Sequence, residues 1–324
     1  MTETKVPDSQ KKAAKVIVTK DNTHFKLAFL HPKNWPLLCG VSLLWFVSLL
    51  PIAVQQPIGR GIGRLVAKLL PRRLKIAQQN LALSFPDKST AEVNALAKKN
   101  FEYTGLAVVD TANAWFWPDW RIQKNMVVEG QEHIEAAKAA GNGMLLLSAH
   151  FLTLEICART FGQIKPGVGV YRPNKNPLME YLQCRGRTRS NKALLDRRDV
   201  KGMLKALNDG DALWYAPDHD YGVRRSVFVP LFAVEKACTI TGTTMLSAGS
   251  NTKTYPCFSS RMADGRYKLM IKAPLENFPT RDLEQDAITC NKVLEEAILE
   301  QLPQYMWLHR RYKTRPEGEA SLYK

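Results

Sequence analysis

The longest apolar stretch of the chain lies near its beginning, between Lys33 and Arg60. No charged residue occurs between these two positions, and residues 35–54 are almost entirely apolar. A helix needs about 20 such residues to cross a bilayer core of roughly 30 Å. We therefore predict a membrane-anchor helix over residues 35–56, which starts too late and lacks the cleavage site of a signal peptide. A buried helix, or a segment that only dips into or lies along one leaflet, also fits, because positive charge flanks both ends.

Residues 1–34 are predicted to form a polar N-terminal tail, of which the first 23 residues are lysine-rich and are expected to be mobile. After the apolar stretch, basic and apolar residues alternate at helical intervals from Ile58 to Leu83. This pattern predicts a basic amphipathic helix. Such a helix can lie in an anionic membrane interface, or it can expose its basic face to solvent above the domain core. We assign residues 57–324 to one domain.

In this domain short apolar runs alternate with helical patterns. Ser89 and Glu92 form a capping-box pattern, which predicts a helix to about Tyr103. Further helices are predicted over residues 131–140, 178–189, 200–208 and 286–301, and strands over residues 144–147, 167–171, 212–216, 227–229 and 267–271. Strands that alternate with helices indicate an α/β fold with a mixed central sheet covered by helices on both faces.

The apolar run 144–147 ends at Ser148-Ala149-His150, and Glu155 follows His150 by five residues. This change of pattern predicts a turn between a buried strand and a helix. Residues of a helix rotate by about 100° each, so the two side chains can meet only if His150 lies at the turn and Glu155 in the first helical turns. The carboxylate would then hold one ring nitrogen while the other faces a substrate hydroxyl, as in an oriented general base. A structural histidine, acting as a cap or a satisfied core group, is the alternative.

A second cluster follows the predicted strand 167–171. Arg172 stands at the end of that strand, where α/β sheets commonly place ligand groups, and Asn176 follows it closely. Arg185 and Arg187 come next and can clamp a phosphate or a carboxylate by paired hydrogen bonds. We predict binding roles for Arg172 and Arg187.

Two more segments concentrate functional residue types. Asp218 and Asp220 directly follow the predicted strand 212–216, and can pair with the arginines or orient a substrate, with a plain charged turn as the alternative. Residues 304–315, which include Arg310, interleave aromatic and cationic side chains. That composition fits either nucleic acid or the headgroup of an anionic lipid.

Charge narrows the choice of partners. Lys and Arg number 46 against 30 Asp and Glu, which gives a formal charge of +16. Such an excess favours a polyanionic partner: nucleic acid, an anionic membrane surface or a phosphorylated substrate. Nucleic acid is disfavoured, because the chain has no recognised binding module. The six cysteines show no paired spacing and read as reduced thiols of a cytosol-facing protein, and the six histidines lie too far apart to predict a metal site.

Five sequence blocks, taken in their order along the chain, resemble the late acyltransferases of lipid A biosynthesis, the lauroyl and myristoyl transferases HtrB and MsbB. The resemblance runs from about Trp35 to Gly318 and is far more specific than the His-x4-acid signature, which belongs to the wider glycerolipid acyltransferase superfamily. One departure is Leu231-Phe232-Ala233, where the family often has Phe-Phe-Gly; we expect it to affect the acyl pocket or local chain path, not the chemistry. The blocks are His150-x4-Glu155, residues 171–187 with their arginines, Asp218-His-Asp-Tyr-Gly222, residues 227–232 and residues 305–311.

The resemblance implies an inner-membrane enzyme of a Gram-negative bacterium, with its active site facing the cytoplasm. Its acyltransferase domain, residues 57–324, would move a fatty acyl chain from acyl carrier protein to a hydroxyl of a Kdo-bearing lipid A precursor. Acyl carrier protein is then a co-substrate, and no metal or other cofactor is expected. His150 would be the general base and Glu155 its orienting partner. The expected substrate-binding residues are Arg172, Asn176, Arg187, Asp218, Asp220 and Arg310.

Both implied substrates are anionic, and so is the membrane leaflet between them, which agrees with the positive charge of the chain. Two rival functions remain. An acyltransferase for glycerol phosphate would leave the block 305–311 unexplained. A membrane-tethered anion-binding protein without chemistry would keep its ligand affinity after Glu155→Ala and would show no turnover. The sequence does not specify the acyl-chain length, the acceptor hydroxyl, the number of chains added or the oligomeric state.

Overall fold

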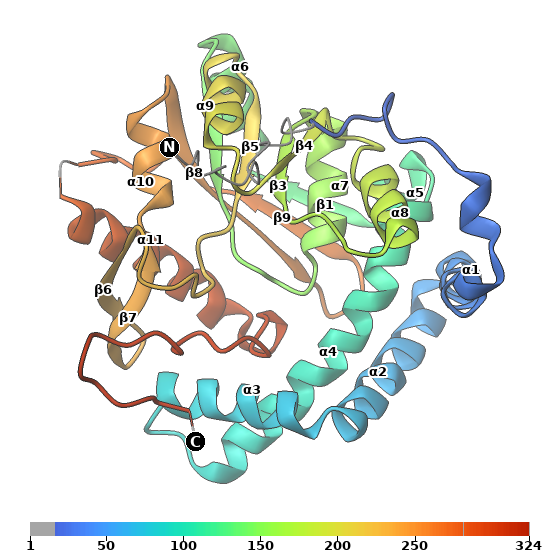
Figure 1. Ribbon diagram of the computed structural model, residues 1–324, viewed down its shortest axis with the longest axis horizontal. Coiled ribbons are helices and arrows are strands. Elements are labelled where there is room, and N and C mark those ends of the chain that lie inside the picture. The colour runs from blue at the N-terminus through green and yellow to red at the C-terminus, as the bar shows by residue number, and fades with distance from the viewer. Residues whose placement is uncertain (1–16, 281, 324) are drawn as a thin grey trace, which may run out of the picture.

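A computed structural model describes residues 17–280 and 282–323 of the chain. Its centre is a seven-stranded sheet (Figure 1). The strands β8 and β9 are antiparallel, and every other neighbouring pair of this sheet is parallel. The sheet is therefore mixed, as predicted. In spatial order its strands are β1 (Met126–Glu129), β9 (Tyr267–Ile271), β8 (Thr252–Arg261), β2 (Gly143–Leu147), β5 (Ala212–Tyr215), β3 (Val168–Tyr171) and β4 (Ala193–Asp196).

Helices cover both faces of the sheet, and the side chains of β2 show this directly. Met144 and Leu146 lie in a core with α6 (Gln131–Ala139) and α7 (Leu154–Ile164). Leu145, on the other face, lies in a core with α9 (Val200–Asn208) and α10 (Gly242–Ala248). All of β2 is buried, which explains why its sequence is continuously apolar instead of alternating. The predicted α/β class is confirmed.

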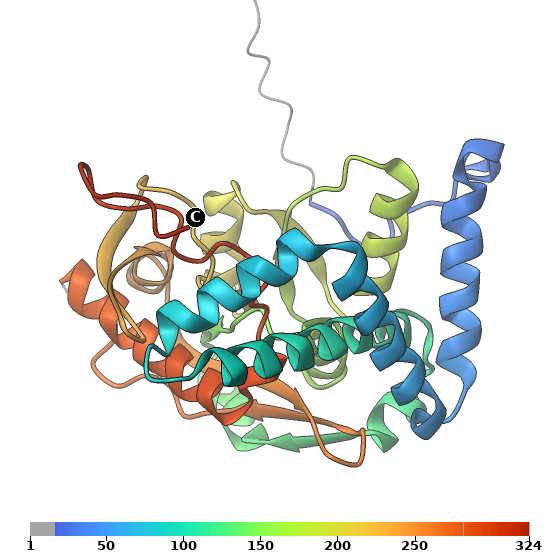
Figure 2. The same cartoon turned by 90° about the horizontal axis from the view of Figure 1, so that it is seen from below.

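A third core lies where β2 ends. Leu147 and Ala149 pack there with α3 (Pro71–Ser84), α4 (Thr90–Phe116) and α11 (Leu283–Glu300). Figure 2 shows α3 and α4 running side by side across the molecule. Ala149 and Phe151 are both buried, so the residues on either side of His150 are fixed in this core. The turn that carries His150 is therefore a rigid part of the fold.

Most predicted helices are confirmed within a few residues, including α6, α8 (Pro177–Arg187), α9 and α11. The Ser89–Glu92 capping box is present, but α4 continues to Phe116, because its later residues Leu106, Val109 and Ala112 are buried. Sequence patterns did not predict β1, β4 or β8. Residues 227–229 do form a strand, but it belongs to a separate hairpin of β6 (Ser226–Leu231) and β7 (Val234–Ile240).

The predicted single helix over residues 35–56 is wrong. The helix α1 covers Trp35–Leu49, and α2 (Ile52–Leu69) begins after a break at Leu50 and Pro51. Proline has no N–H to donate and restricts the residue before it to extended conformations, which Leu50 adopts. None of the described helices is both long enough and apolar enough to cross a membrane.

The amphipathic segment 58–83 is likewise divided, at Pro71, between α2 and α3. In the predicted tail, residues 1–16 lie outside the described part of the chain. Residues 17–34 are mostly exposed but contact the body of the protein at a few positions. Val18 pairs with Leu194 of β4, and the buried ring of Phe29 contacts Tyr181 of α8.

The helices α2 and α4 touch backbone to backbone at Gly59, Gly63 and Gly105. A Cβ on Gly63 would overlap the carbonyl oxygen of Phe101, and one on Gly105 would overlap that of Gly59. We expect Gly63→Ala to lower the free energy of unfolding by about 1–3 kcal/mol, because the two backbones must separate. Gly61 of the same helix has nothing within 4 Å of its Cβ position, so Gly61→Ala is the matched control. Thermal unfolding measures both, and equal effects would contradict the contact.

Candidate active site

His150 lies just beyond the carboxyl end of β2, beside Asp218, which follows the neighbouring strand β5. Leu147 of β2 pairs with Tyr215 of β5, and His150 and Asp218 each lie three residues beyond their member of this pair. The backbone N–H of His150 donates to Asp218 Oδ2 at 3.0 Å, and its Nδ1 lies 2.7 Å from Oδ1. One carboxylate therefore fixes both the backbone and the ring of His150.

The charge of Asp218 sets the tautomer of His150. Burial by itself would raise the pKa of Asp218, but the proximity of His150 and His219 and the hydrogen bonds from His150 hold that pKa well below its usual range. An ionised carboxylate only accepts hydrogen bonds, so Nδ1 carries a proton, and in the neutral ring the lone pair is then on Nε2. Nε2 has no hydrogen-bond partner among the described residues, and the side chain of His150 is 24% exposed. The free lone pair can therefore take a proton from a bound molecule.

The predicted contact between Glu155 and His150 is wrong. Glu155 does lie in the first turn of α7, but its carboxylate is bound by Arg187 of α8. Arg187 Nε donates to Oε1 at 3.0 Å and to Oε2 at 3.2 Å, Nη2 also donates to Oε1, and Trp115 Nε1 donates to Oε2 at 3.2 Å. Burial would raise the pKa of Glu155, but the charge and hydrogen bonds of Arg187 lower it below its usual range. Glu155 thus orients Arg187, while Asp218 orients His150.

Breaking this ion pair should cost stability. The side chains of Glu155 and Arg187 are only 19% and 26% exposed, so Glu155→Gln leaves a half-buried guanidinium without its counter-charge. We expect the free energy of unfolding to fall by about 2–3 kcal/mol, less than for a fully buried pair. Glu135→Gln, which breaks an exposed pair with Lys138, should cost less than about 1 kcal/mol. Denaturant unfolding of both variants tests this, and a small effect at Glu155 would count against it.

Three histidine rings stack beside Asp218. The rings of His150 and His219 are nearly parallel, with centroids 3.6 Å apart and an interplanar angle of 12°. His309 stacks on the outer face of His219, with centroids 4.2 Å apart. Sequence patterns did not predict roles for His219 or His309, because the three histidines are far apart in the chain. The one available signal was the position of His219 directly after Asp218.

This cluster does not fit a shared metal ion. His150, Asp218 and His219 each offer a ligand atom, and these atoms lie within 4.8 Å of one another. A metal binds an imidazole nitrogen along its lone pair, in the plane of the ring. The lone pairs of two parallel, stacked rings point side by side and do not converge on one ion. The arrangement is suited to ring stacking and not to coordination.

Burial lowers the pKa of His219 to about 3, from an ordinary value of 6.5. Between these values the unfolded chain binds a proton at this position and the folded chain does not. Folding stability should therefore fall as the pH decreases from about 6.5 toward about 3. We expect His219→Phe to flatten this dependence. Denaturation midpoints of both proteins at pH 7, 6 and 5 give the measurement; parallel curves would contradict the assignment.

The segment that follows α11 closes the site from the side. Leu152 and Met306 donate backbone hydrogen bonds to Gln304 and His150 respectively, at 2.8 and 3.0 Å. The side-chain amide of Asn100 in α4 donates to the carbonyl of Tyr305 at 2.6 Å, and that of Asn80 in α3 donates to the carbonyl of Trp307 at 2.6 Å. The backbone of residues 304–306, itself anchored by α3 and α4, thus holds the histidine turn in place.

The remaining predicted residues lie around this centre. Arg172 follows β3 at the same edge of the sheet and is exposed. Asn176 caps α8 by accepting from the N–H groups of Leu178 and Met179. Asp220 is buried and accepts from the backbone and the hydroxyl of Thr314, both at 2.7 Å, so its observed contacts are structural. Arg310 is exposed, with its guanidinium 5.4 Å from the ring centre of Tyr323. Their binding roles stay predictions.

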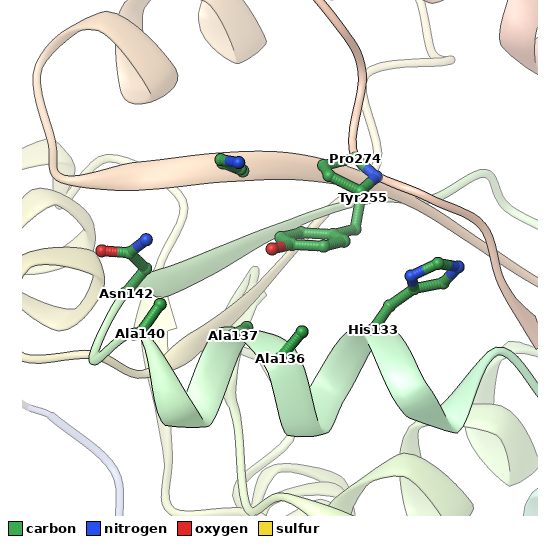
Figure 3. A pocket seen from close by; sticks show the side chains of 8 residues that line it. His133, Ala136, Ala137, Ala140, Asn142, Tyr255 and Pro274 are labelled. Carbon is green, nitrogen blue, oxygen red and sulfur yellow. The ribbon is translucent and has the colours of Figure 1, made fainter.

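A small cavity of about 130 Å³ lies away from this centre (Figure 3). His133 and Ala136 on α6, and Ala140 directly after that helix, face Tyr255 and Pro274 across it. Asn142 and Lys253, which also line it, are next to the starts of β2 and β8, whereas His150 follows the end of β2. The cavity therefore lies near the amino ends of β2 and β8, whereas the stacked histidines lie beyond the carboxyl end of β2. It is not part of the candidate active site.

Residues 22–314 match the family model described as bacterial lipid A biosynthesis acyltransferase. The chain is 50% identical over 300 residues to the lipid A biosynthesis lauroyltransferase of Escherichia coli (strain K12), covering 92% of this chain and 98% of that protein. It is 42% identical, with the same coverage, to the lipid A biosynthesis palmitoleoyltransferase of that organism. The myristoyltransferase of the same strain is 27% identical over 305 residues, which cover 93% of this chain and 94% of that protein. The similarity therefore extends over nearly the whole chain and is not confined to the histidine motif.

Proposed function

The chain belongs to the bacterial lipid A biosynthesis acyltransferase family, and from this premise we propose that it transfers a fatty acyl chain from acyl carrier protein to a hydroxyl of a Kdo-bearing lipid A precursor. The observation that carries the proposal is the imidazole of His150, bound through Nδ1 by Asp218 at 2.7 Å. Its Nε2 is left as an accessible base. Direct transfer between two bound substrates requires such a base and no protein nucleophile.

In the proposed reaction both substrates are bound together. His150 Nε2 takes the proton of the acceptor hydroxyl as that oxygen attacks the carbonyl carbon of the thioester. Asp218 stabilises the imidazolium that forms. The carbon–sulfur bond then breaks, the ester remains on the lipid, and the proton passes from His150 to the departing thiolate. Protons and bonds balance without any other reactant.

Arg187 is our candidate for stabilising the oxyanion that develops on the thioester carbonyl. Its guanidinium is held by Glu155 in the first turn of α7, the helix that directly follows the histidine turn. On this proposal Glu155 is a positioning residue that acts through Arg187. Arg172 and Arg310, both exposed, are candidates for binding the phosphates and carboxylates of the lipid headgroup.

We also propose that the protein works on the cytoplasmic face of the inner membrane and lies in one leaflet. Figure 2 shows α1 standing at one side of the molecule. Its exposed apolar side chains would favour the bilayer over water. The adjoining helix α2 adds exposed leucines next to basic residues, which suits an anionic surface. The exposed apolar residues concerned are Trp35, Leu43, Trp45, Phe46, Leu49, Leu65 and Leu69.

The test is a reaction with defined substrates. Purified protein is incubated with an acyl carrier protein thioester and a Kdo-bearing lipid A precursor, and the products are weighed by mass spectrometry. We expect the precursor to gain the mass of one fatty acyl group, which also identifies the chain. Glycerol phosphate replaces the lipid in a parallel reaction. Acylation of glycerol phosphate alone would support the rival enzyme, and no acyl transfer to either acceptor would overturn the proposal.

A further inference from the structure

His219 contacts the proposed base but has no part in the reaction described above. Its ring lies face to face with that of His150, and it follows Asp218, which holds His150 by the ring edge. Two consecutive residues of one loop therefore fix the edge and the face of the same imidazole. His309 covers the other face of His219, so the middle ring of the stack is enclosed on both sides.

The environment of His219 keeps its ring neutral. Its Nε2 is buried and has no hydrogen-bond partner in the part of the chain that the structure describes. A proton added there would be poorly solvated and would lie beside His150. Burial and the nearby histidines accordingly lower the pKa of His219, to about 3. His219 is thus the neutral ring of this pair, and a proton taken up by His150 in the proposed reaction would lie over its face.

A parallel stack changes in strength when one ring is protonated. Two neutral aromatic rings gain little from a face-to-face arrangement and prefer offset or edge contacts. A cation over the face of a neutral ring is attracted by its π electrons. The stack between His150 and His219 should therefore be stronger after His150 has taken a proton than before. An interaction that strengthens along the reaction lowers its barrier.

We propose that His219 is a positioning residue that stabilises the imidazolium of His150 through its ring face, with His309 supporting it from behind. This inference rests on the proposed function, because it takes His150 to be the general base. It adds a residue that acts only through His150 and touches neither substrate. The contribution depends on the π electrons of the ring and not on its nitrogen atoms.

The experiment compares two replacements of similar size. His219→Phe keeps an aromatic face, whereas His219→Leu fills the space without one. We expect the leucine variant to lose roughly 10- to 30-fold in kcat, the range of a desolvated cation–π contact. The acid limb of its kcat/KM profile should move to lower pH, because protonation of the base is less favourable. The phenylalanine variant should stay within about threefold of the parent protein with the acid limb unmoved.

His133→Leu, in the distant cavity of Figure 3, is the matched control and should change neither quantity. If the leucine variant does not fold, His219→Met provides the same comparison. Equal losses in the aromatic and aliphatic variants with unmoved acid limbs would overturn the inference in favour of simple space filling. Full activity of the aliphatic variant would also overturn it. His150→Ala separates the two proposals: retained activity there defeats both, whereas loss of activity together with unaffected His219 variants defeats this inference alone.

Discussion

Replacing His150 with alanine is expected to reduce acyl transfer by roughly 1,000- to 10,000-fold, because it removes the only proposed acceptor for the hydroxyl proton. The neighbouring ring of His219 cannot take over this role through Nε2, because that atom is buried. Initial rates with saturating acyl carrier protein thioester give the measurement. His150 is partly exposed, so the fold should survive the change.

His133→Ala is the control for this substitution and should keep the parent rate. Thermal unfolding shows whether the His150 variant is folded, and a vesicle-binding assay shows whether it binds lipid as the parent protein does. An His150→Ala protein that is folded and retains more than a few per cent of the parent activity would contradict the assignment of the base.

Asp218→Asn should cost about 100- to 10,000-fold in kcat, the second largest effect we expect. The amide oxygen of asparagine can still accept from the backbone N–H of His150. Its NH₂ group then faces Nδ1 and can only donate to it, so the ring proton is displaced to Nε2. The ring keeps its position but presents a proton where the reaction needs a lone pair. Rates measured from pH 6 to pH 9 would show the loss at every pH.

Asp209→Asn is the matched control, since Asp209 lies on the surface and pairs only with Lys205 among the described residues. Comparing Asp218→Asn with Glu155→Gln shows which carboxylate orients His150. If the Glu155 variant showed the loss expected at Asp218 while Asp218→Asn kept its activity, the histidine would be oriented by the motif's own carboxylate. The hydrogen bond between Asp218 and His150 seen in the free protein would then not be the one that orients the base during the reaction.

The sequence was sufficient to predict the histidine turn, because an apolar run that ends in polar residues is a local signal. The partner of that histidine was not predictable in the same way. Asp218 meets His150 because β2 and β5 are neighbours in register, and the order of strands in a sheet depends on crossovers far along the chain. The contact between Glu155 of α7 and Arg187 of α8 likewise joins residues that are far apart in the sequence. Local patterns located these residues, but they could not assign partners to them.

Two further differences from the predictions concern one helix and one strand. The apolar stretch 35–54 looks like one helix by composition, yet Pro51 divides it. The strand β8 was missed because its apolar residues are mixed with Thr252, Lys253 and Ser260. In the first case the effect of Pro51 on the backbone outweighs the apolar composition. In the second case a central strand carries polar side chains, because tertiary contacts satisfy their hydrogen bonds. Thr252 Oγ1, for example, donates to the carbonyl of Gly143 at 2.6 Å.

The backbone pairing of His150 and Leu152 with Gln304 and Met306 has a consequence for biosynthesis. During translation His150 leaves the ribosome long before Met306 does. A nascent chain that lacks residues 304–306 already contains His150 and Asp218, but not the segment whose backbone secures the histidine turn. The proposed general base should therefore be held in its working position only when synthesis has passed that segment.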